Sequence, residues 1–282
     1  MTKKKVQGLL FIGPALLLLL LFYVLPVLVT IVLSFFETSH YISYTWVGLE
    51  HYQKLIGSGF LDALWVSSKF LIAMYIYNML ISYLIAVALH FVSPKISVLM
   101  RTVYYVPVVL SGVATVSVWR WILSSPGIIN VALGKAGLGP YLWLGNPGLS
   151  AWAVAFVMMM GYVGGNLLLW SAALGQIPQD IIDAARVDGA GTFRLIWNIL
   201  TPLTQPTRMY LVIITFLGAM QVWEHPWLFT SGGPSGSSTT VALKIFNTAF
   251  TQGKIGLASS MTTVTLLVSM ALATYLIRKG LV

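Results

Sequence analysis

Charged side chains are scarce in this sequence of 282 residues. Lysine, arginine, aspartate and glutamate together make up 8% of the chain, against about 25% in an average soluble domain. Hydrophobic residues make up 58%. So few ionic groups cannot solvate the surface of a water-soluble particle of this size, and so apolar a chain does not stay disordered. The composition therefore excludes a soluble enzyme and a disordered chain, and it predicts a polytopic membrane protein.

Cysteine is absent, which excludes disulfide bonds, a thiolate nucleophile and a cysteine-ligated metal site. The four histidines, His40, His51, His90 and His225, are scattered, and no two have the spacing of metal ligands. We therefore expect no metal site. The net charge of +9 fits membrane topology and contact with anionic membrane lipid better than it fits nucleic acid, which we do not expect as a partner.

Long apolar runs supply the positive evidence for membrane insertion. A helix needs about 20 largely apolar residues to cross a hydrocarbon layer of ~30 Å. Six segments qualify, some of them imperfectly, namely Leu9–Leu33, Ala63–Phe91, Val103–Leu123, Ser150–Leu174, Arg208–Val222 and Leu257–Ile277, of which Arg208–Val222 is the shortest. The first is too long for a secretory signal and lacks a small-residue cleavage site, so we expect a retained helix. The sequence predicts an all-α membrane protein with six transmembrane helices in one domain, residues 1–282.

Positive charge indicates which side of the membrane holds the termini, since six crossings place both ends on the same side. On that side lie Lys3, Lys4, Lys5, Lys95, Arg101, Arg186, Arg194, Arg208, Arg278 and Lys279. On the other side lie Lys54, Lys69, Arg120, Lys135, Lys244 and Lys254. This bias predicts that the N- and C-termini are cytoplasmic.

One polar segment on the predicted cytoplasmic side, residues 175–206, differs from an ordinary loop. Pro178 and the acidic Asp180 and Asp183 are typical of a helix start. Gly189 indicates a helix end or a sharp turn. A second short helix is expected over Thr192–Leu200.

We predict that this second helix ends at Pro202, so that the segment forms a helix-turn-helix. Ala184 and Ala185 would give it a small surface that another protein can approach closely. The alternative is a solvated loop without a role, but the start and stop signals in both halves argue against it.

The same segment resembles a known signature. Asp183-Ala184-Ala185, Gly189, Ile199 and Pro202 stand at the spacing of E-A-A-x3-G-x9-I-x-L-P, the EAA motif of the permease subunits of bacterial ABC importers. Asp188, before the glycine, fits the extended form of the motif. Asp183 replaces the glutamate but keeps its carboxylate, and Thr201 replaces the leucine.

Further stretches along the chain resemble carbohydrate-uptake permeases of this family. They are Gly13-Pro14-Ala15, Trp46–Tyr52, Arg101–Pro107, Trp119-Arg120-Trp121, Gly127–Asn130 and Thr230–Pro234. Two permeases usually pair in that family, and this chain resembles the first, the F-type permease of maltose transporters. The resemblance implies the type I ABC importer architecture, a location in the bacterial cytoplasmic (inner) membrane and a sugar or oligosaccharide as substrate.

The resemblance also implies the partners. They are a second, non-identical permease that completes the translocation pathway, two ATPase subunits and an extracytoplasmic solute-binding protein. The ATPase would receive the residues of the EAA motif, namely Asp183, Ala184, Ala185, Asp188, Gly189, Ile199 and Pro202. The chain contains no G-x4-G-K-[ST] loop, so we expect it to hold no cofactor and to be no enzyme, with ATP and Mg²⁺ bound by the partner ATPase.

Analogy with the family places the solute near the fourth and fifth helices. The candidate residues are Tyr162, Gly165, Asn166, Ala219, Gln221, Val222, Trp223 and Glu224. A sugar site needs aromatic faces for C–H surfaces and amides or carboxylates for hydroxyls, and Tyr162, Asn166, Gln221 and Trp223 supply these types. The alternative is that the glycines of the fourth helix only let helices pack closely, with Tyr162 an ordinary interface aromatic.

Two other functions stay open at this stage. One is an ABC importer permease for a non-sugar solute such as glycerol phosphate, which calls for convergent Arg or Lys at mid-membrane, and no span centre has one. The other is an ion-coupled secondary transporter, whose proton relays need buried Asp, Glu or His, and the spans offer almost none. Both considerations favour a neutral solute and an external energy source.

Overall fold

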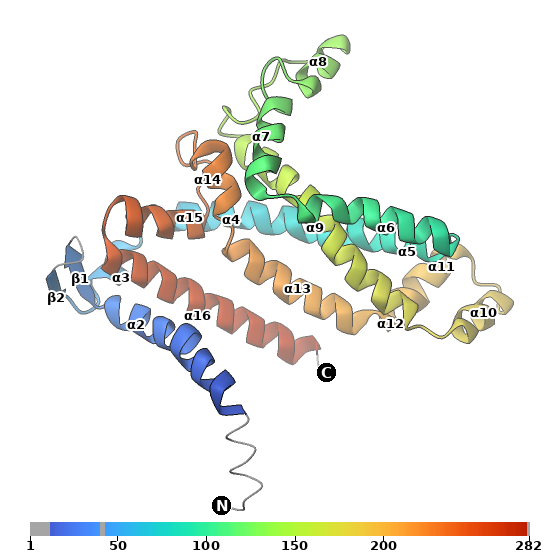
Figure 1. Cartoon of the computed structure of the whole chain (residues 1–282), viewed down its shortest axis with the longest axis horizontal. Helices are drawn as coiled ribbons and strands as arrows, with labels where there is room; N and C mark the ends of the chain where they lie inside the picture. Colours follow the sequence, from blue (N-terminus) through green and yellow to red (C-terminus); the bar gives the residue numbers. More distant parts are fainter. Residues whose placement is uncertain (1–11, 40–42, 281–282) are drawn as a thin grey trace, which may run out of the picture. The chain divides into compact units, whose positions relative to one another are not determined.

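The structure is a computed structural model that describes residues 12–39 and 43–280. These residues are mostly helical (Figure 1) and divide into two compact units. Unit 1 takes in the described residues of Met1–Leu61 together with Lys244–Val268. Unit 2 takes in Asp62–Leu243 and the described residues of Ser269–Val282. Both units therefore join segments that lie far apart in the sequence, and a single domain over residues 1–282 stays a prediction.

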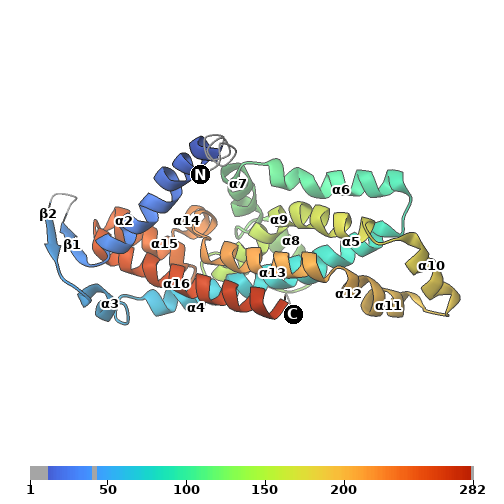
Figure 2. The same cartoon turned by 90° about the horizontal axis from the view of Figure 1, so that it is seen from below.

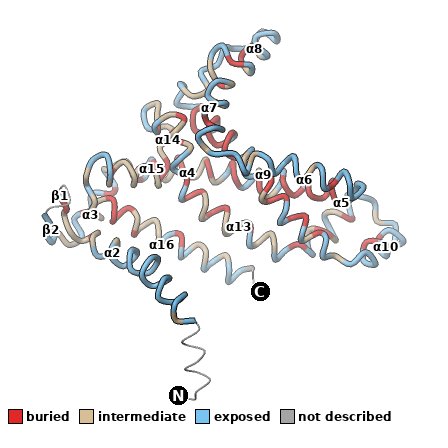
Figure 3. Tube along the Cα trace, viewed as in Figure 1, coloured by how far each residue is buried: buried red, intermediate tan, exposed pale blue. Residues whose placement is uncertain are grey.

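The first predicted helix is present over Ile12–Leu33, and residues 9–11 lie outside the described part of the chain. It consists of a first helical stretch, a π-helical turn η1 (Leu20–Val24) and helix α2 (Leu25–Leu33). None of its residues is buried, as the pale blue trace of α2 shows (Figure 3). Such a uniformly apolar and exposed helix is suited to a lipid environment.

Unit 1 contains a small β-hairpin that the all-α prediction did not include. Strand β1 (Phe36–Ser39) pairs antiparallel with β2 (Ser43–Trp46), and Phe36 stands opposite Trp46. The aromatic ring of Phe35 stacks on Trp46 with 5.7 Å between centroids. Aromatic pairing of this kind stabilises a two-stranded ribbon that would be marginal alone. A short helix α3 (Glu50–Lys54) follows.

The C-terminal part of unit 1 closes tightly on this hairpin. His51 of α3 is 2% exposed, and its Nε2 donates a hydrogen bond to the carbonyl of Phe36 at 3.1 Å. The backbone N–H of Gly256, in the first turn of α16 (Ile255–Gly280), donates to Oγ1 of Thr38 at 3.0 Å. A Cβ atom at position 256 would stand 2.0 Å from the Phe36 carbonyl oxygen, so only glycine fits there.

The predicted second, fourth and sixth helices are confirmed. The second runs without a break over Phe60–His90 as α4 (Phe60–Tyr75), the π-helical turn η2 (Ile76–Ile81) and α5 (Ser82–His90). The fourth is α9 (Ser150–Gly175), and the sixth is α16. By length and composition, these three and Ile12–Leu33 are the helices that can each cross a membrane alone within the described residues.

The third predicted helix, Val103–Leu123, is not one straight helix. Helix α6 (Pro94–Val109) and helix α7 (Gly112–Ile122) meet at an angle of 96°. The break occurs at Leu110 and Ser111, whose backbones are extended, and the Ser111 hydroxyl caps α7 by accepting a hydrogen bond from the Ala114 N–H at 3.2 Å. Pro107 removes one N–H from the end of α6, which weakens the helix shortly before the bend.

The fifth predicted helix, Arg208–Val222, is present but is too short to cross a membrane alone. Helix α13 (Gln205–Met220) has 16 residues. At 1.5 Å per residue it is about 24 Å long, less than the ~30 Å of a hydrocarbon layer. The structure therefore contains four helices that can span a membrane, or five if the bent pair α6–α7 counts as one, within the described residues. Six spans stay a prediction.

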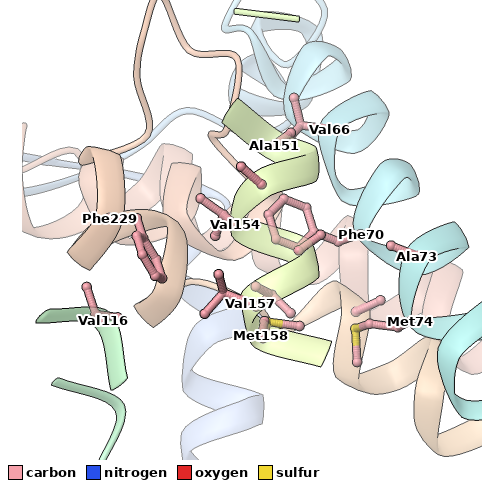
Figure 4. Close-up of a cluster of buried hydrophobic side chains, with 14 of the residues drawn as sticks. Val66, Phe70, Ala73, Met74, Val116, Ala151, Val154, Val157, Met158 and Phe229 are labelled. Atoms are coloured by element: carbon pink, nitrogen blue, oxygen red, sulfur yellow. The ribbon is translucent and has the colours of Figure 1, made fainter. Parts of the chain in front are cut away.

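Helix α9 is the centre of unit 2. Figure 4 shows Phe70 and Met74 of α4 on one side of α9, with Val154 and Val157 of α9 on the side nearer Phe229, and Met158 of α9 belongs to the same cluster. Ala219 and Val222 from the end of α13, Phe229 of α14 (Glu224–Thr230) and Val116 of α7 complete this first buried cluster. Burying such apolar side chains is the main stabilising contribution to the packing of α4, α9 and α13.

A second buried cluster lies further along α9. Leu167, Trp170 and Leu174 of α9 pack with Tyr83 and Ala86 of α5. The cluster continues into the segment after α9, through Ile182, Ala185, Leu195 and Leu200. The segment 175–206, which the sequence predicts to be cytoplasmic, is therefore packed against α5 and α9 and is not a free loop.

Candidate functional site

A cavity of about 320 Å³ opens where the broken helix pair α6–α7 meets α9 and the start of α14. Its walls are formed by Pro107, Val108, Leu110, Gly112, Thr115, Val157, Met158, Gly161, Tyr162, Gly165, Asn166, Glu224 and His225. The wall is largely apolar, with a few polar groups directed into it, which is the usual composition of a small-molecule site.

The cavity brings together four of the eight predicted pathway residues, Tyr162, Gly165 and Asn166 from α9 and Glu224 from α14. The other four do not line it. Ala219 and Val222 are buried in the first cluster of unit 2. Gln221 and Trp223 are exposed and stand in the link between α13 and α14.

The three glycines in the middle of α9 have different roles. A Cβ atom at Gly164 would stand 2.4 Å from the carbonyl oxygen of Tyr104, so this glycine lets α6 and α9 come into close contact. Cβ atoms at Gly161 or Gly165 would meet nothing within 4 Å, and both glycines line the cavity. The packing alternative therefore holds for Gly164, whereas the other two leave space for a ligand.

Asn166 is held in place by a buried hydrogen-bond network. Its Nδ2 donates to Oδ1 of Asn78 at 2.6 Å, and Nδ2 of Asn78 donates to Oγ1 of Thr215 at 3.1 Å. Trp170 Nε1 donates to the backbone carbonyl of Asn78 at 3.0 Å. Asn78 lies in the π-helical turn η2, and the network ties α9, α13 and the second helix together at one level. One N–H and the side-chain carbonyl of Asn166 stay available to a ligand.

Glu224 supplies the negative charge of the cavity. A Cβ atom at Gly112 would stand 2.9 Å from Glu224 Oε1, so the carboxylate lies against the first residue of α7. The N-terminal end of a helix carries partial positive charge and is a favourable place for a carboxylate. None of the lysines or arginines in the described parts of the chain forms an ion pair with Glu224.

The second candidate site is the predicted cytoplasmic segment. Helix α10 (Gln179–Val187), helix α11 (Thr192–Leu195), the π-helical turn η3 (Ile196–Leu200) and helix α12 (Thr201–Leu203) form the predicted helix-turn-helix. Figures 1 and 2 both place them at the end of α5 and α9.

Gly189 ends α10 in the way that the sequence predicts. Its φ is +78°, a conformation that favours glycine. The Ala190 N–H bonds to the Ala185 carbonyl at 2.9 Å and the Gly189 N–H to the Arg186 carbonyl at 3.0 Å. These two bonds are the Schellman pattern, which satisfies carbonyls at the helix end and fixes the turn. Asp188, just before the glycine, is exposed.

The predicted Ala-Ala surface is only half correct. Ala184 is exposed, but Ala185 is buried in the second cluster beside Ile182 because helical residues one position apart face different directions. The apolar side chains that the segment presents outward are instead Val187, 87% exposed, and Phe193, 77% exposed. Asp183 is also exposed, and its carboxylate accepts a hydrogen bond from Gln179 Nε2 at 3.1 Å.

The second helix of this segment does not end at Pro202. The helical run continues to Leu203, with Pro202 exposed in the first turn of α12. The turn η3 directly before it shifts the hydrogen-bond register, so that the Thr201 N–H pairs with the Ile196 carbonyl, to which the Thr201 hydroxyl also donates at 2.8 Å. The missing N–H of proline is thus tolerated. Ile199 is partly buried against the second cluster.

Comparison with known proteins identifies the family to which this chain belongs. Residues 78–280 match the family described as binding-protein-dependent transport system inner membrane component. The chain belongs to this family. It is therefore a multi-pass membrane permease of the ABC importer class, and the resemblance based on the EAA motif is confirmed.

Curated permeases align along almost the whole chain. A probable ABC transporter permease protein, YurN of Bacillus subtilis, is 30% identical over 278 residues, which cover 96% of this chain and 95% of that protein. The trehalose/maltose transport system permease protein MalF of Thermococcus litoralis is 25% identical, with 97% and 93% covered. An arabinooligosaccharides transport system permease, AraP of Bacillus subtilis, is 23% identical, with 94% and 85% covered.

Solved structures show the same fold. A chain of a bacterial ABC transporter involved in the import of the acidic polysaccharide alginate superposes with a TM-score of 0.85 at 20% identity, covering 98% of this chain and 96% of that chain. The same kind of transporter in complex with an alginate pentasaccharide-bound periplasmic protein gives a TM-score of 0.84 at 20% identity, with 97% and 93% covered. At this identity the likeness shows the type I permease fold.

Part of the permease cavity escaped prediction. Pro107, Leu110, Gly112 and Thr115 line it from the α6–α7 bend, which the apolar run 103–123 concealed. The available signal was Pro107 and Gly112 standing five residues apart inside an apolar segment, because such interruptions mark broken helices at transport sites. His225, which the sequence indicates only as one of four scattered histidines, also lines the cavity.

Proposed function

We propose that this permease is a subunit of a binding-protein-dependent ABC importer for a sugar or oligosaccharide and forms half of the translocation pathway. The transport systems to which relatives belong support this assignment, since MalF belongs to a trehalose/maltose system and AraP to an arabinooligosaccharide system. The observation that carries it is the cavity of about 320 Å³ at the broken helix pair, which is lined by the aromatic Tyr162 and by the side-chain amide of Asn166.

The chemistry of this cavity suits a hydroxylated solute. Tyr162 offers an aromatic face for the C–H surface of a sugar ring, and Asn166 offers both a donor and an acceptor for hydroxyl groups. Gly165 leaves open space beside them. The proposed pathway also includes four residues that do not line the cavity but lie directly before Glu224 in the chain, at the end of α13 and in its link to α14. They are Ala219, Gln221, Val222 and Trp223.

The segment α10–α12 is the proposed docking surface for a separate ATPase. Asp183, Ala184, Asp188 and Gly189 belong to its exposed first half. Ala185 and Ile199 fix the segment to the second buried cluster, and Pro202 is exposed in α12. Exposed Val187 and Phe193 provide apolar contact area at its tip. ATP and Mg²⁺ would bind to that ATPase, and closure of two ATPase subunits would drive rigid-body alternation of the permeases.

The complete transporter would contain a second, non-identical permease, two ATPase subunits and an extracytoplasmic solute-binding protein. A periplasmic partner supports the last, since one of the similar solved transporters is in complex with a periplasmic protein. The excess of Lys and Arg on the side of the termini supports cytoplasmic N- and C-termini in the bacterial inner membrane.

A pair of glycine variants tests the docking proposal. Gly189→Val places a β-branched residue at φ +78° and should distort the Schellman turn, so that uptake or ATPase association falls at least tenfold. Gly191→Val is the matched control, because Gly191 has φ −66° and open space around its Cβ position. Normal uptake and normal co-purification of the ATPase with Gly189→Val would refute the docking role.

The energy source separates this proposal from an ion-coupled secondary transporter. We expect uptake to collapse on ATP depletion and to survive an uncoupler. Ion-driven uptake by the purified chain alone in liposomes would overturn the ABC importer assignment. Uptake of glycerol phosphate rather than sugar by the assembled transporter would favour the non-sugar alternative.

A further inference from the structure

We propose that the carboxylate of Glu224 gives the cavity a charge selectivity, so that the pathway admits uncharged sugars and disfavours uronate or phosphorylated ones. This inference rests on the proposed function, because it names the substrate class of the same cavity. It makes Glu224 a specificity-determining residue rather than a general pathway residue.

The position of Glu224 is the first argument. It lines the cavity at the first residue of α14, and its Oε1 lies so close to Gly112 that a Cβ atom there would be 2.9 Å away. Gly112 and Thr115 of α7 and Tyr162 of α9 line the same cavity. The carboxylate therefore stands in the cavity wall between the bent helix pair and α9, within reach of a solute bound there.

The absence of a compensating cation is the second argument. The titratable side chains in the cavity wall are Tyr162, Glu224 and His225, with no lysine or arginine among the described lining residues. His225 adds no positive charge, because burial lowers the pKa of its imidazole and it is neutral at pH 7. The wall thus carries one net negative charge.

A fixed negative charge in the cavity wall repels an anionic sugar. Like charges a few ångströms apart interact more strongly near protein than in bulk water, so discrimination on the order of tenfold or more is expected. A neutral sugar is not repelled by the carboxylate, and its hydroxyl groups can donate hydrogen bonds to it. The solute would then differ in charge from alginate, the acidic polysaccharide imported by the transporter with the similar fold.

The natural absence of cysteine allows the cavity potential to be measured directly. Gly165→Cys places a single thiol in the cavity wall, where a Cβ atom meets nothing within 4 Å. In the assembled transporter, we would compare the rates at which equal-sized cationic and anionic methanethiosulfonate reagents modify this thiol. Gly161→Cys, which also lines the cavity with open space, is the second site if the first variant assembles poorly.

We expect the cationic-to-anionic rate ratio at position 165 to fall about tenfold when Glu224→Gln is added. Gly134→Cys in α8 (Ile128–Lys135), outside the cavity wall, is the control and should show an unchanged ratio. An unchanged ratio at both 165 and 161 would overturn the proposal, and it would leave the sugar-import function standing.

Protection by sugars completes the test. Maltotriose should slow modification of Cys at position 165 by an uncharged reagent, and trigalacturonate should do so only in the Glu224→Gln background. Equal protection by both sugars in the presence of Glu224 would refute the charge selectivity. Protection by neither sugar, with the rate ratio behaving as expected, would count against the proposed function and not against the charge of the cavity.

Discussion

At the scale of single residues, the glycines show most clearly where two parts of the chain are in close contact. Gly256 sits against the carbonyl of Phe36 and the imidazole of His51, and a Cβ atom there would be 2.0 Å and 2.6 Å from the two atoms. The neighbouring Thr38 hydroxyl accepts the Gly256 N–H. No side chain can be added without moving the hairpin, α3 or the start of α16.

Gly256→Ala should therefore destabilise unit 1. Overpacking of this kind costs about 1–3 kcal/mol, which should lower the midpoint of thermal denaturation in detergent by several degrees. Fluorescence-detected size exclusion after heating is a suitable measurement. Gly134→Ala is the matched control, since a Cβ atom at that helical position meets nothing within 4 Å, and it should be neutral or slightly stabilising. Equal stability of both variants would contradict the close contact.

Side-chain chemistry predicted part of the site, and burial decided the rest. Aromatic and amide groups suit sugars, which indicates Tyr162, Asn166, Gln221 and Trp223. Tyr162 and Asn166 line the cavity, whereas Gln221 and Trp223 do not. Ala219 and Val222 were included by their position in the chain alone, and they lie in the apolar cluster. In a uniformly apolar helix, the face that contacts a ligand and the face that packs against another helix consist of the same residue types. The sequence alone therefore does not indicate which face is which.

At the scale of elements, the contact between α6 and α9 depends on one glycine out of three. Gly164→Ala should force the two helices apart, because its Cβ would stand 2.4 Å from the Tyr104 carbonyl oxygen and 2.6 Å from the Tyr105 Cα. We expect a loss of about 1–3 kcal/mol in stability, measured as a lower midpoint of thermal denaturation.

Gly161→Ala is the matched comparison for this prediction, as it lies in the same helix with open space at the Cβ position. Its stability should stay the same or rise slightly, because alanine favours helix. Any effect of Gly161→Ala should appear in transport, since the residue lines the cavity. The reverse pattern of stabilities would mean that the packing face of α9 is assigned wrongly.

Long apolar runs predicted helices well, and interruptions within them were harder to interpret. Helices over Phe60–His90, Ser150–Gly175 and Ile255–Gly280 match the apolar runs closely. The 96° bend between α6 and α7 was missed because Leu110 and Ser111 take an extended backbone inside a run whose hydropathy stays continuous. The exposure of Ala184 and burial of Ala185 likewise depend on which face of α10 meets α5 and α9.

At the scale of the whole molecule, the distribution of positive charge predicts the orientation in the membrane. Ten of the 16 lysines and arginines lie on the side assigned to the termini, so a fluorescent protein fused after Val282 should fold and fluoresce in the cytoplasm. Alkaline phosphatase fused at the same place should be inactive. Active phosphatase with a dark fluorescent protein would reverse the assigned topology.

Unit 1 cannot fold completely until most of the chain has been synthesised, because it joins an N-terminal and a C-terminal segment. Thr38 and Gly256 are 218 residues apart in the chain, yet they share a hydrogen bond. At about 5–20 residues per second, the ribosome needs roughly 10–40 s to supply the second partner after the first. Throughout that interval His51 and the hairpin lack the helix that buries them, so a chain truncated before residue 256 presents the cell with a permanently incomplete N-terminal unit. We therefore expect a shortened permease to differ from the full-length one already in the part of the chain that is made first.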